Sequence, residues 1–133
     1  DMILKELMDI KYRINTSSSI LTDKEKTAFF FVIIPEEMVL LDTQKAAGLF
    51  EKYQVPLSGY IVNRVIPKEL GERKIPDYLR HRLEMQEGYL KRINKLFGDQ
   101  VLARVQEFER DITGLPMIEK VAEAMFGPIP ESA

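Results

Sequence analysis

The sequence predicts an α/β fold in which a partial parallel sheet is flanked by helices. Three short apolar runs, at residues 27–34, 57–66 and 101–105, have the length and composition of β-strands. Four segments whose apolar residues recur every three or four positions precede, separate and follow these runs, which gives the order α-β-α-β-α-β-α. Strands that alternate with helices are joined by crossover connections, and such connections produce a parallel sheet.

The first helix is predicted at residues 2–14. Its apolar residues are spaced three and four apart and form one stripe along the helix. The polar run "NTSSS", residues 15–19, interrupts this stripe, and we interpret it as a loop or a frayed helix end. The first strand follows at residues 27–34, where a continuous apolar run predicts burial on both faces of the sheet.

The second helix is predicted to have the segment "PEE", residues 35–37, in its first turn and to end near Tyr53. Proline suits the first turn of a helix, because its missing N–H would have no partner there. The carboxylates of Glu36 and Glu37 suit the positive end of the helix dipole, so helix-end charge is the simpler interpretation of this pair than a catalytic role.

The third helix is predicted to begin at Asp77, a good N-cap residue, and to end at Gly98. A polar loop with two prolines and a glycine, residues 67–76, separates it from the second strand. After the third strand, a charged loop leads to the last amphipathic helix at residues 115–126, which a Gly-Pro pair ends.

Composition excludes several classes of protein. The net charge of −2 gives no general attraction to nucleic acid. The absence of cysteine excludes disulfides and thiolate metal sites and fits a cytoplasmic protein, and no apolar run is long enough to span a membrane. No Gly-Lys pair occurs, so this chain has no phosphate-binding loop, and we expect no metal site. The single histidine, His81, lies between two arginines and is predicted to be on the surface.

The topology predicts where a ligand would bind. In open parallel sheets, ligands bind at the carboxyl ends of the strands, where Glu36, Asn63 and the loop after Val105 fall. A buried amide must be hydrogen-bonded, so Asn63 is expected either to hold a neighbouring loop or to face a ligand such as adenine, and both alternatives stay open. Arg64 is expected to cap the strand end or to pair with a nearby acid.

The stretch "FVIIPEEMVLLDTQKAAGLFEKYQVPLSGYIVNRVIP" resembles the second half of the ArsA-type anion-transporting ATPases. This family includes the arsenical pump-driving ATPase and the cytosolic ATPase that delivers tail-anchored membrane proteins. The similarity continues in "RLEMQEGYLKRINKLF" and in "EFERDITGLPMIEKVAEAMFG", and so covers nearly the whole chain. The resemblance implies that the sheet is a fragment of a P-loop NTPase fold.

The resemblance also implies roles for individual residues. Asn63 would read the adenine ring of ATP, and Gln106, Glu107 and Phe108 would pack on the other side of the base. The family usually has a proline where Gln106 stands. The groups that hold the phosphates and Mg²⁺ would lie upstream, in a missing N-terminal P-loop portion, so we expect no catalytic residue in this chain and no ATPase activity from it alone.

Two domain parts are implied by the same resemblance. Residues 1–19 would be the end of a helical insertion plus a hinge, and residues 27–133 the C-terminal α/β part of the nucleotide-binding domain. The parent protein would be a cytoplasmic homodimer that works with a membrane transporter or a client protein. Independently of the family, three parallel strands leave an apolar edge unpaired, which favours association by edge pairing or by exchange of the first helix.

Two other functions compete with the first. The chain could be a non-enzymatic α/β module that docks a partner through helix 37–53, using the surface of Glu36, Asp42 and Lys45. A weaker alternative is a small hydrolase that uses Glu36, but no second acid, base or nucleophile is placed to work with it.

Overall fold

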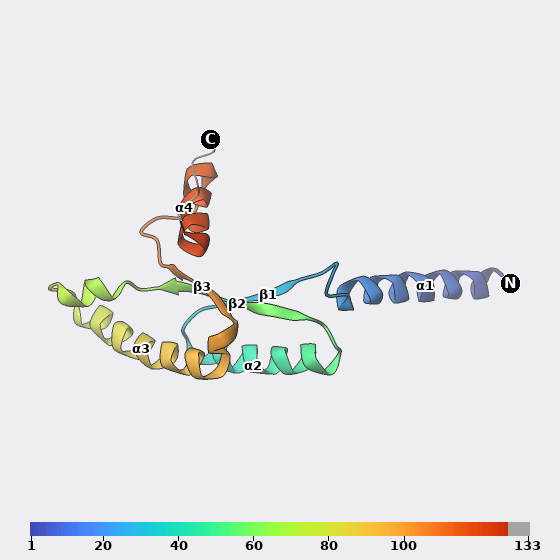
Figure 1. The fold of residues 1–133 in the computed structure, drawn as a ribbon, viewed down its shortest axis with the longest axis horizontal. Helices are drawn as coiled ribbons and strands as arrows, with labels where there is room; N and C mark the ends of the chain where they lie inside the picture. Colours follow the sequence, from blue (N-terminus) through green and yellow to red (C-terminus); the bar gives the residue numbers. More distant parts are fainter. Residues whose placement is uncertain (128–133) are drawn as a thin grey trace.

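A computed structural model describes residues 1–127 and confirms the predicted element order (Figure 1). The helices and strands are α1 (Met2–Thr22), β1 (Phe29–Ile33), α2 (Glu37–Lys52), β2 (Leu57–Val65), α3 (Asp77–Phe97), β3 (Val101–Gln106) and α4 (Gly114–Phe126). Two short 3₁₀ helices, η1 (Lys68–Glu72) and η2 (Gly98–Gln100), lie on either side of α3. The proline that was predicted to follow α4 lies outside the described residues.

The three strands form one sheet in the order β1-β2-β3, and both pairs are parallel. The prediction of a partial parallel sheet with flanking helices is therefore confirmed. Val62 lies at the centre of the sheet, opposite Ile33 on β1 and Arg104 on β3. Gly59 of β2 lies close to Gln100, the last residue of η2. A Cβ atom at position 59 would lie only 2.8 Å from the Gln100 carbonyl oxygen, so glycine permits this close approach.

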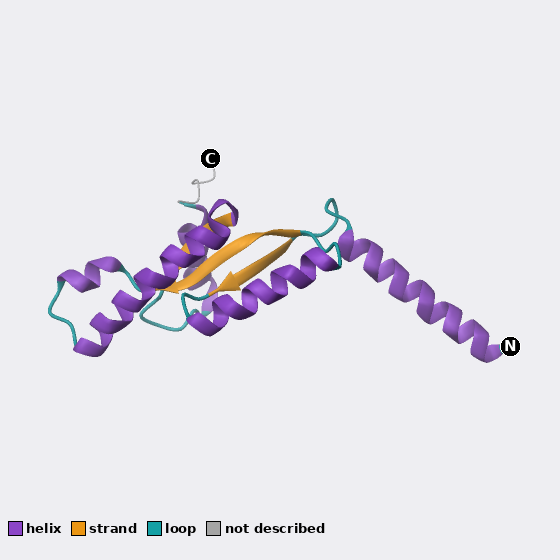
Figure 2. Ribbon diagram, turned by 90° about the horizontal axis from the view of Figure 1, so that it is seen from below, coloured by secondary structure: helices purple, strands orange, loops and turns teal. Residues whose placement is uncertain are grey.

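The core lies between the sheet and two helices. Helices α2 and α3 cover the same face of the sheet, as Figure 2 shows, and α4 packs against β3 on the other side. The buried cluster takes residues from the sheet and from both helices: Ile33, Leu40, Tyr60, Val62, Leu90, Ile93 and Phe97. The rings of Tyr60 and Phe97 stack with centroids 4.2 Å apart, and burial raises the pKa of the Tyr60 hydroxyl.

The prediction that the first strand is buried on both faces is wrong. Phe30 and Val32 point to the face that α2 and α3 leave open, and they are 46% and 62% exposed. Both helices lie on one side, so within residues 1–127 nothing covers the opposite face of β1. A continuous apolar run cannot show which of its two faces a helix will cover.

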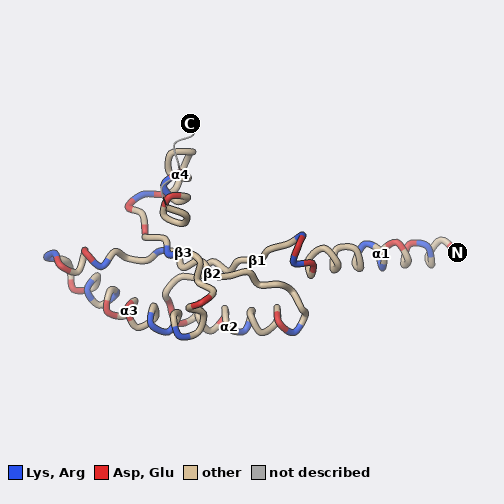
Figure 3. The backbone as a smooth tube through the Cα atoms, in the orientation of Figure 1, with Lys and Arg blue, Asp and Glu red and all other residues tan. Residues whose placement is uncertain are grey.

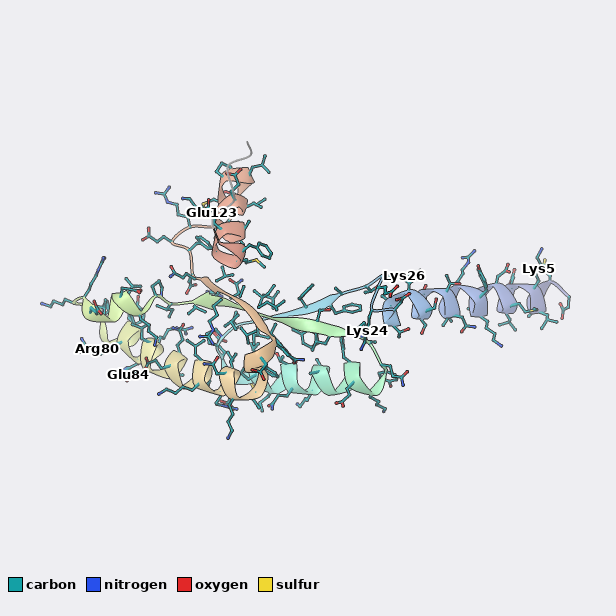
Figure 4. The ribbon with its side chains drawn as sticks, in the orientation of Figure 1. Lys5, Lys24, Lys26, Arg80, Glu84 and Glu123 are labelled. Atoms are coloured by element: carbon teal, nitrogen blue, oxygen red, sulfur yellow. The ribbon has the colours of Figure 1, made fainter. Side chains whose placement is uncertain are left out.

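The interpretation of residues 15–19 as a loop or a frayed end is also wrong, because α1 continues without a break to Thr22. The hydroxyl groups of Ser19 and Thr22 donate to carbonyl oxygens one turn back, both at 2.8 Å, and so hydrogen-bond within the helix. Helix α1 projects away from the sheet, and its side chains, Lys5 among them, extend into open space (Figure 4). An exposed helix does not need an unbroken apolar stripe.

Three smaller predictions are corrected at element boundaries. Pro76 occupies the N-cap position of α3, and Asp77 is the first helical residue. Gly98 ends α3 as predicted, but it has right-handed helical dihedrals and continues into η2. Gln106 belongs to β3 and not to the loop that follows, because it pairs with Val65 on β2.

Candidate functional site

The candidate site lies at the carboxyl ends of β2 and β3. A surface depression of about 760 Å³ is lined by Asn63, Gln106, Glu107 and Phe108, so the structure brings together the four residues that were predicted to contact adenine. Whether they bind a nucleotide stays a prediction. The rest of the lining comes from Arg64 and from the charged segment between β3 and α4, residues 109–112, which Figure 3 shows carrying both acidic and basic side chains.

Asn63 is half-buried and directly follows Val62, the last residue of β2 before its register against β3 shifts. Its Oδ1 atom accepts a hydrogen bond from the Arg64 backbone N–H at 2.8 Å. The amide nitrogen Nδ2 donates no hydrogen bond to another group among residues 1–127. The Oδ1 atom of Asn63 is therefore hydrogen-bonded to the backbone of the next residue, while the two N–H donors of Nδ2 are available to a ligand.

Arg64 has a left-handed backbone conformation, with φ of 56°. The register of β2 against β3 shifts between Val62 and Val65, which is where this residue lies. Its guanidinium donates from Nε and Nη2 to the same Glu107 oxygen, at 3.1 and 2.7 Å. The prediction that Arg64 pairs with a nearby acid is confirmed. The hydrogen bonds to Glu107 are the main cause that raises the pKa of the guanidinium, and electrostatic attraction to the same carboxylate adds to the effect.

A second cavity of about 320 Å³ lies between the start of α2, helix α3 and the end of β2. Its lining includes the apolar side chains of Met38, Met85 and Tyr89. Glu36 also lines it and pairs with Arg82 of α3 at 3.4 Å. This ion pair links the start of α2 to α3 on the surface of the molecule. Whether Glu36 contacts a partner stays a prediction.

The other residues of the predicted docking surface lie elsewhere. Asp42 and Lys45 are exposed on α2 and do not line the depression around Asn63. Between them, Thr43 is buried and donates to the Val39 carbonyl oxygen. His81 is exposed on α3, as predicted. The structure therefore separates Asp42 and Lys45 from the predicted base site, whereas Glu36 lines the cavity next to it.

Gln86 is a residue at this rim that the sequence did not single out. It is 4% exposed, and its side-chain amide accepts from the Ile66 N–H at 2.8 Å and donates to the Ile66 carbonyl at 2.9 Å. This pair of bonds ties α3 to the backbone just after β2. A polar residue within the apolar stripe of the third helix was the signal that could have indicated it.

Neither a metal centre nor a membrane-spanning helix is seen in the part of the chain that the structure describes. Among residues 1–127, no three carboxylate or imidazole groups gather closely enough to hold a metal ion. Within the same range, no helix combines the length and the apolar character needed to cross a bilayer.

Comparison with known proteins places the chain in a family. The sequence model of the family described as anion-transporting ATPase matches residues 1–127. A protein of Aquifex aeolicus named as an arsenical pump-driving ATPase is 31% identical over 126 residues, which cover 95% of this chain and 32% of that protein. The ATPase ASNA1 homolog of Trypanosoma cruzi is 28% identical over 109 residues, covering 80% of this chain and 30% of that protein.

A plant relative gives the same result. The ATPase GET3A of Arabidopsis thaliana is 26% identical over 129 residues, which cover 96% of this chain and 36% of that protein. The chain therefore spans about a third of the length of the relatives that it matches. The family resemblance inferred from the sequence is confirmed, and the chain belongs to the anion-transporting ATPase family.

Proposed function

We propose that this chain supplies the adenine-recognition side of an ATP-binding, ATP-hydrolysing member of the family. The observation that carries the proposal is the depression at the sheet rim, where Asn63 lies with Gln106, Glu107 and Phe108. It has the position expected for a ligand site in a parallel sheet, and the relatives are named as ATPases.

The chemistry of the depression suits a purine base. The amide nitrogen Nδ2 of Asn63 can donate to a ring nitrogen of the base. Its Oδ1 atom, which accepts from the Arg64 N–H, can accept a second hydrogen bond from an amino group of the base. Phe108 is half-buried in the same lining and offers an aromatic surface for stacking. Gln106, where the family usually has proline, adds a further amide at the edge of the depression.

The phosphates and Mg²⁺ would be held by residues outside this chain, because it contains no phosphate-binding loop. We therefore propose that residues 1–133 alone do not hydrolyse ATP. The measurement is ATP turnover by the purified segment with and without Mg²⁺, beside the full-length protein. Turnover that depends on Mg²⁺ and co-purifies with the segment would contradict the proposal.

The organisation of the whole protein is proposed on the family resemblance. Residues 1–19 would end a helical insertion, and residues 27–133 would form the C-terminal α/β part of the nucleotide-binding domain. The protein would act as a cytoplasmic homodimer that serves a membrane transporter or a client protein. The exposed apolar face of β1 would contact the N-terminal P-loop portion.

A docking function for α2 is the second candidate, and the exposure of Asp42 and Lys45 on that helix favours it. The two functions differ in which residues they require. If docking is the function, reversing the charge at Asp42 or Lys45 disrupts it, whereas changing Asn63 does not.

Replacing Asn63 by alanine in the full-length protein tests the first candidate. We expect ATP to bind about 3- to 10-fold more weakly, as for the loss of one or two hydrogen bonds, and kcat to change little because the phosphate groups are held elsewhere. Equilibrium titration with ATP and with GTP measures both affinity and base preference. Asn15→Ala, an exposed asparagine of α1, is the matched control. Unchanged ATP affinity in Asn63→Ala would refute adenine recognition at this rim.

A further inference from the structure

Arg64 adopts a conformation that its position in the chain does not explain. Among residues 1–127, only Arg64 and Gln54 have positive φ without being glycine. Gln54 follows the end of α2, where a left-handed residue is an ordinary way to stop a helix, and the Val55 N–H donates to the Phe50 carbonyl there. Arg64 lies inside β2, where no helix ends and where the left-handed region is disfavoured for a long side chain.

The conformation has one clear structural result. By breaking the register between Val62 and Val65, it lets the Arg64 side chain reach Glu107, which lies 43 positions further along the chain. Glu107 is then held at two points. Its carboxylate accepts from the guanidinium, and its backbone N–H donates to the Val65 carbonyl at 2.9 Å.

The ion pair lies at a boundary between two cavities. Arg64 and Glu107 line both the depression around Asn63 and the smaller cavity at the start of α2. They therefore form a shared wall, and any movement of the Glu107 side chain changes the shape of the depression. On the far side of this wall, Glu36 adds a second negative charge that acts on Arg64.

We propose that Arg64 is a positioning residue for the base pocket: its ion pair with Glu107 holds the segment of Gln106, Glu107 and Phe108 in place beside Asn63. This inference rests on the proposed function, because the segment matters only if it contacts a base. Arg64 itself need not touch the nucleotide. The effect is modest, since the two side chains are 61% and 39% exposed and solvent screens their attraction.

The test uses Arg64→Asn and Glu107→Gln in the full-length protein, singly and together. Asparagine tolerates the left-handed region but cannot form the fork of hydrogen bonds to Glu107, so the backbone is kept while the ion pair is lost. We expect the KM for ATP to rise about two- to fivefold in each single variant, and we expect kcat to be unchanged in Arg64→Asn. The double variant should be no worse than either single one, because both changes remove the same interaction.

A second readout does not depend on nucleotide. Hydrogen exchange of the Glu107 amide without ATP should become about two- to fivefold faster in Arg64→Asn, because the loop is no longer held through the carboxylate. Gln54→Asn, at the other left-handed position, is the matched control, and it should change neither the exchange at Glu107 nor the KM. Exchange at core amides shows that each variant is folded.

The outcomes separate this inference from the proposed function. If Asn63→Ala weakens ATP binding but Arg64→Asn changes neither the KM nor the exchange at Glu107, the positioning role is overturned and the function stands. Effects of the two single changes that add in the double variant would also overturn it. If Arg64→Asn speeds exchange but neither it nor Asn63→Ala alters ATP binding, the function is refuted, and the positioning role fails with it.

Discussion

Replacing Ile93 by alanine is expected to lower the free energy of unfolding by about 2–5 kcal/mol. The Ile93 side chain is completely buried in the cluster that joins α3 to the sheet and to α2. Its loss removes apolar area from the core and leaves a cavity, because the stacked rings of Tyr60 and Phe97 and the packed backbone around them limit how far the site can collapse.

The measurement is chemical unfolding of the full-length protein, with the midpoint and slope compared between variants. Leu96→Ala is the matched control, since Leu96 is on the same helix but 41% exposed, and it should cost less than about 1 kcal/mol. Equal losses for the two substitutions would contradict the packing of α3 against the sheet through Ile93.

Replacing Gln86 by leucine is expected to cost about 2–4 kcal/mol, although leucine is similar in size and apolar. The Gln86 side chain supplies both the acceptor for the Ile66 N–H and the donor for the Ile66 C=O, and leucine supplies neither. Because Ile66 is only 8% exposed, both backbone groups would be buried without a hydrogen bond. The loss should concentrate where β2 leaves the sheet, and hydrogen exchange of the Ile66 amide should show it.

Two further variants make the Gln86 experiment specific. Gln44→Leu replaces an exposed glutamine of α2 and should change stability by no more than about 0.5 kcal/mol. Gln86→Glu keeps an acceptor for the Ile66 N–H but places a carboxylate oxygen against the Ile66 carbonyl. Protonation would restore the donor, so the pKa of the new carboxyl would be raised in the folded state.

The sign of the pH dependence follows from that raised pKa. The stabilisation by the protonated carboxyl is fully present below the ordinary glutamate pKa of about 4.3 and is lost as the pH rises through the folded value. The stability deficit of Gln86→Glu relative to the native protein should therefore shrink as the pH is lowered. A deficit that grows on acidification would contradict the two-bond contact with Ile66.

Much of the fold is predictable from the sequence because it depends on local patterns. The helical periodicity of α2, α3 and α4 and the short apolar runs of β1, β2 and β3 identify six of the elements, and their alternation predicts the parallel sheet. Runs and spacings spread over nearly the whole chain also point to the family. The position of Asn63 at the rim follows from the same topology.

The errors arise where a local signal has two physical outcomes. Serines and threonines favour loops, but they also bond to carbonyls inside a helix, and in α1 they do the latter. An apolar strand can be buried on one face or on two, and β1 shows Val32 to solvent because α2 and α3 pack on the same side. Neither choice is encoded within the few residues concerned.

The sequence by itself determined the order of elements, the parallel sheet, the family and the rim on which Asn63 lies. Only the tertiary structure decided which groups meet there: Gln86 with the backbone of Ile66, and Arg64 with Glu107. These contacts join residues 20 and 43 positions apart. They depend on the register of β2 against β3, on the left-handed backbone conformation of Arg64 and on which side of α3 faces the sheet. No pattern of neighbouring residues specifies these three features.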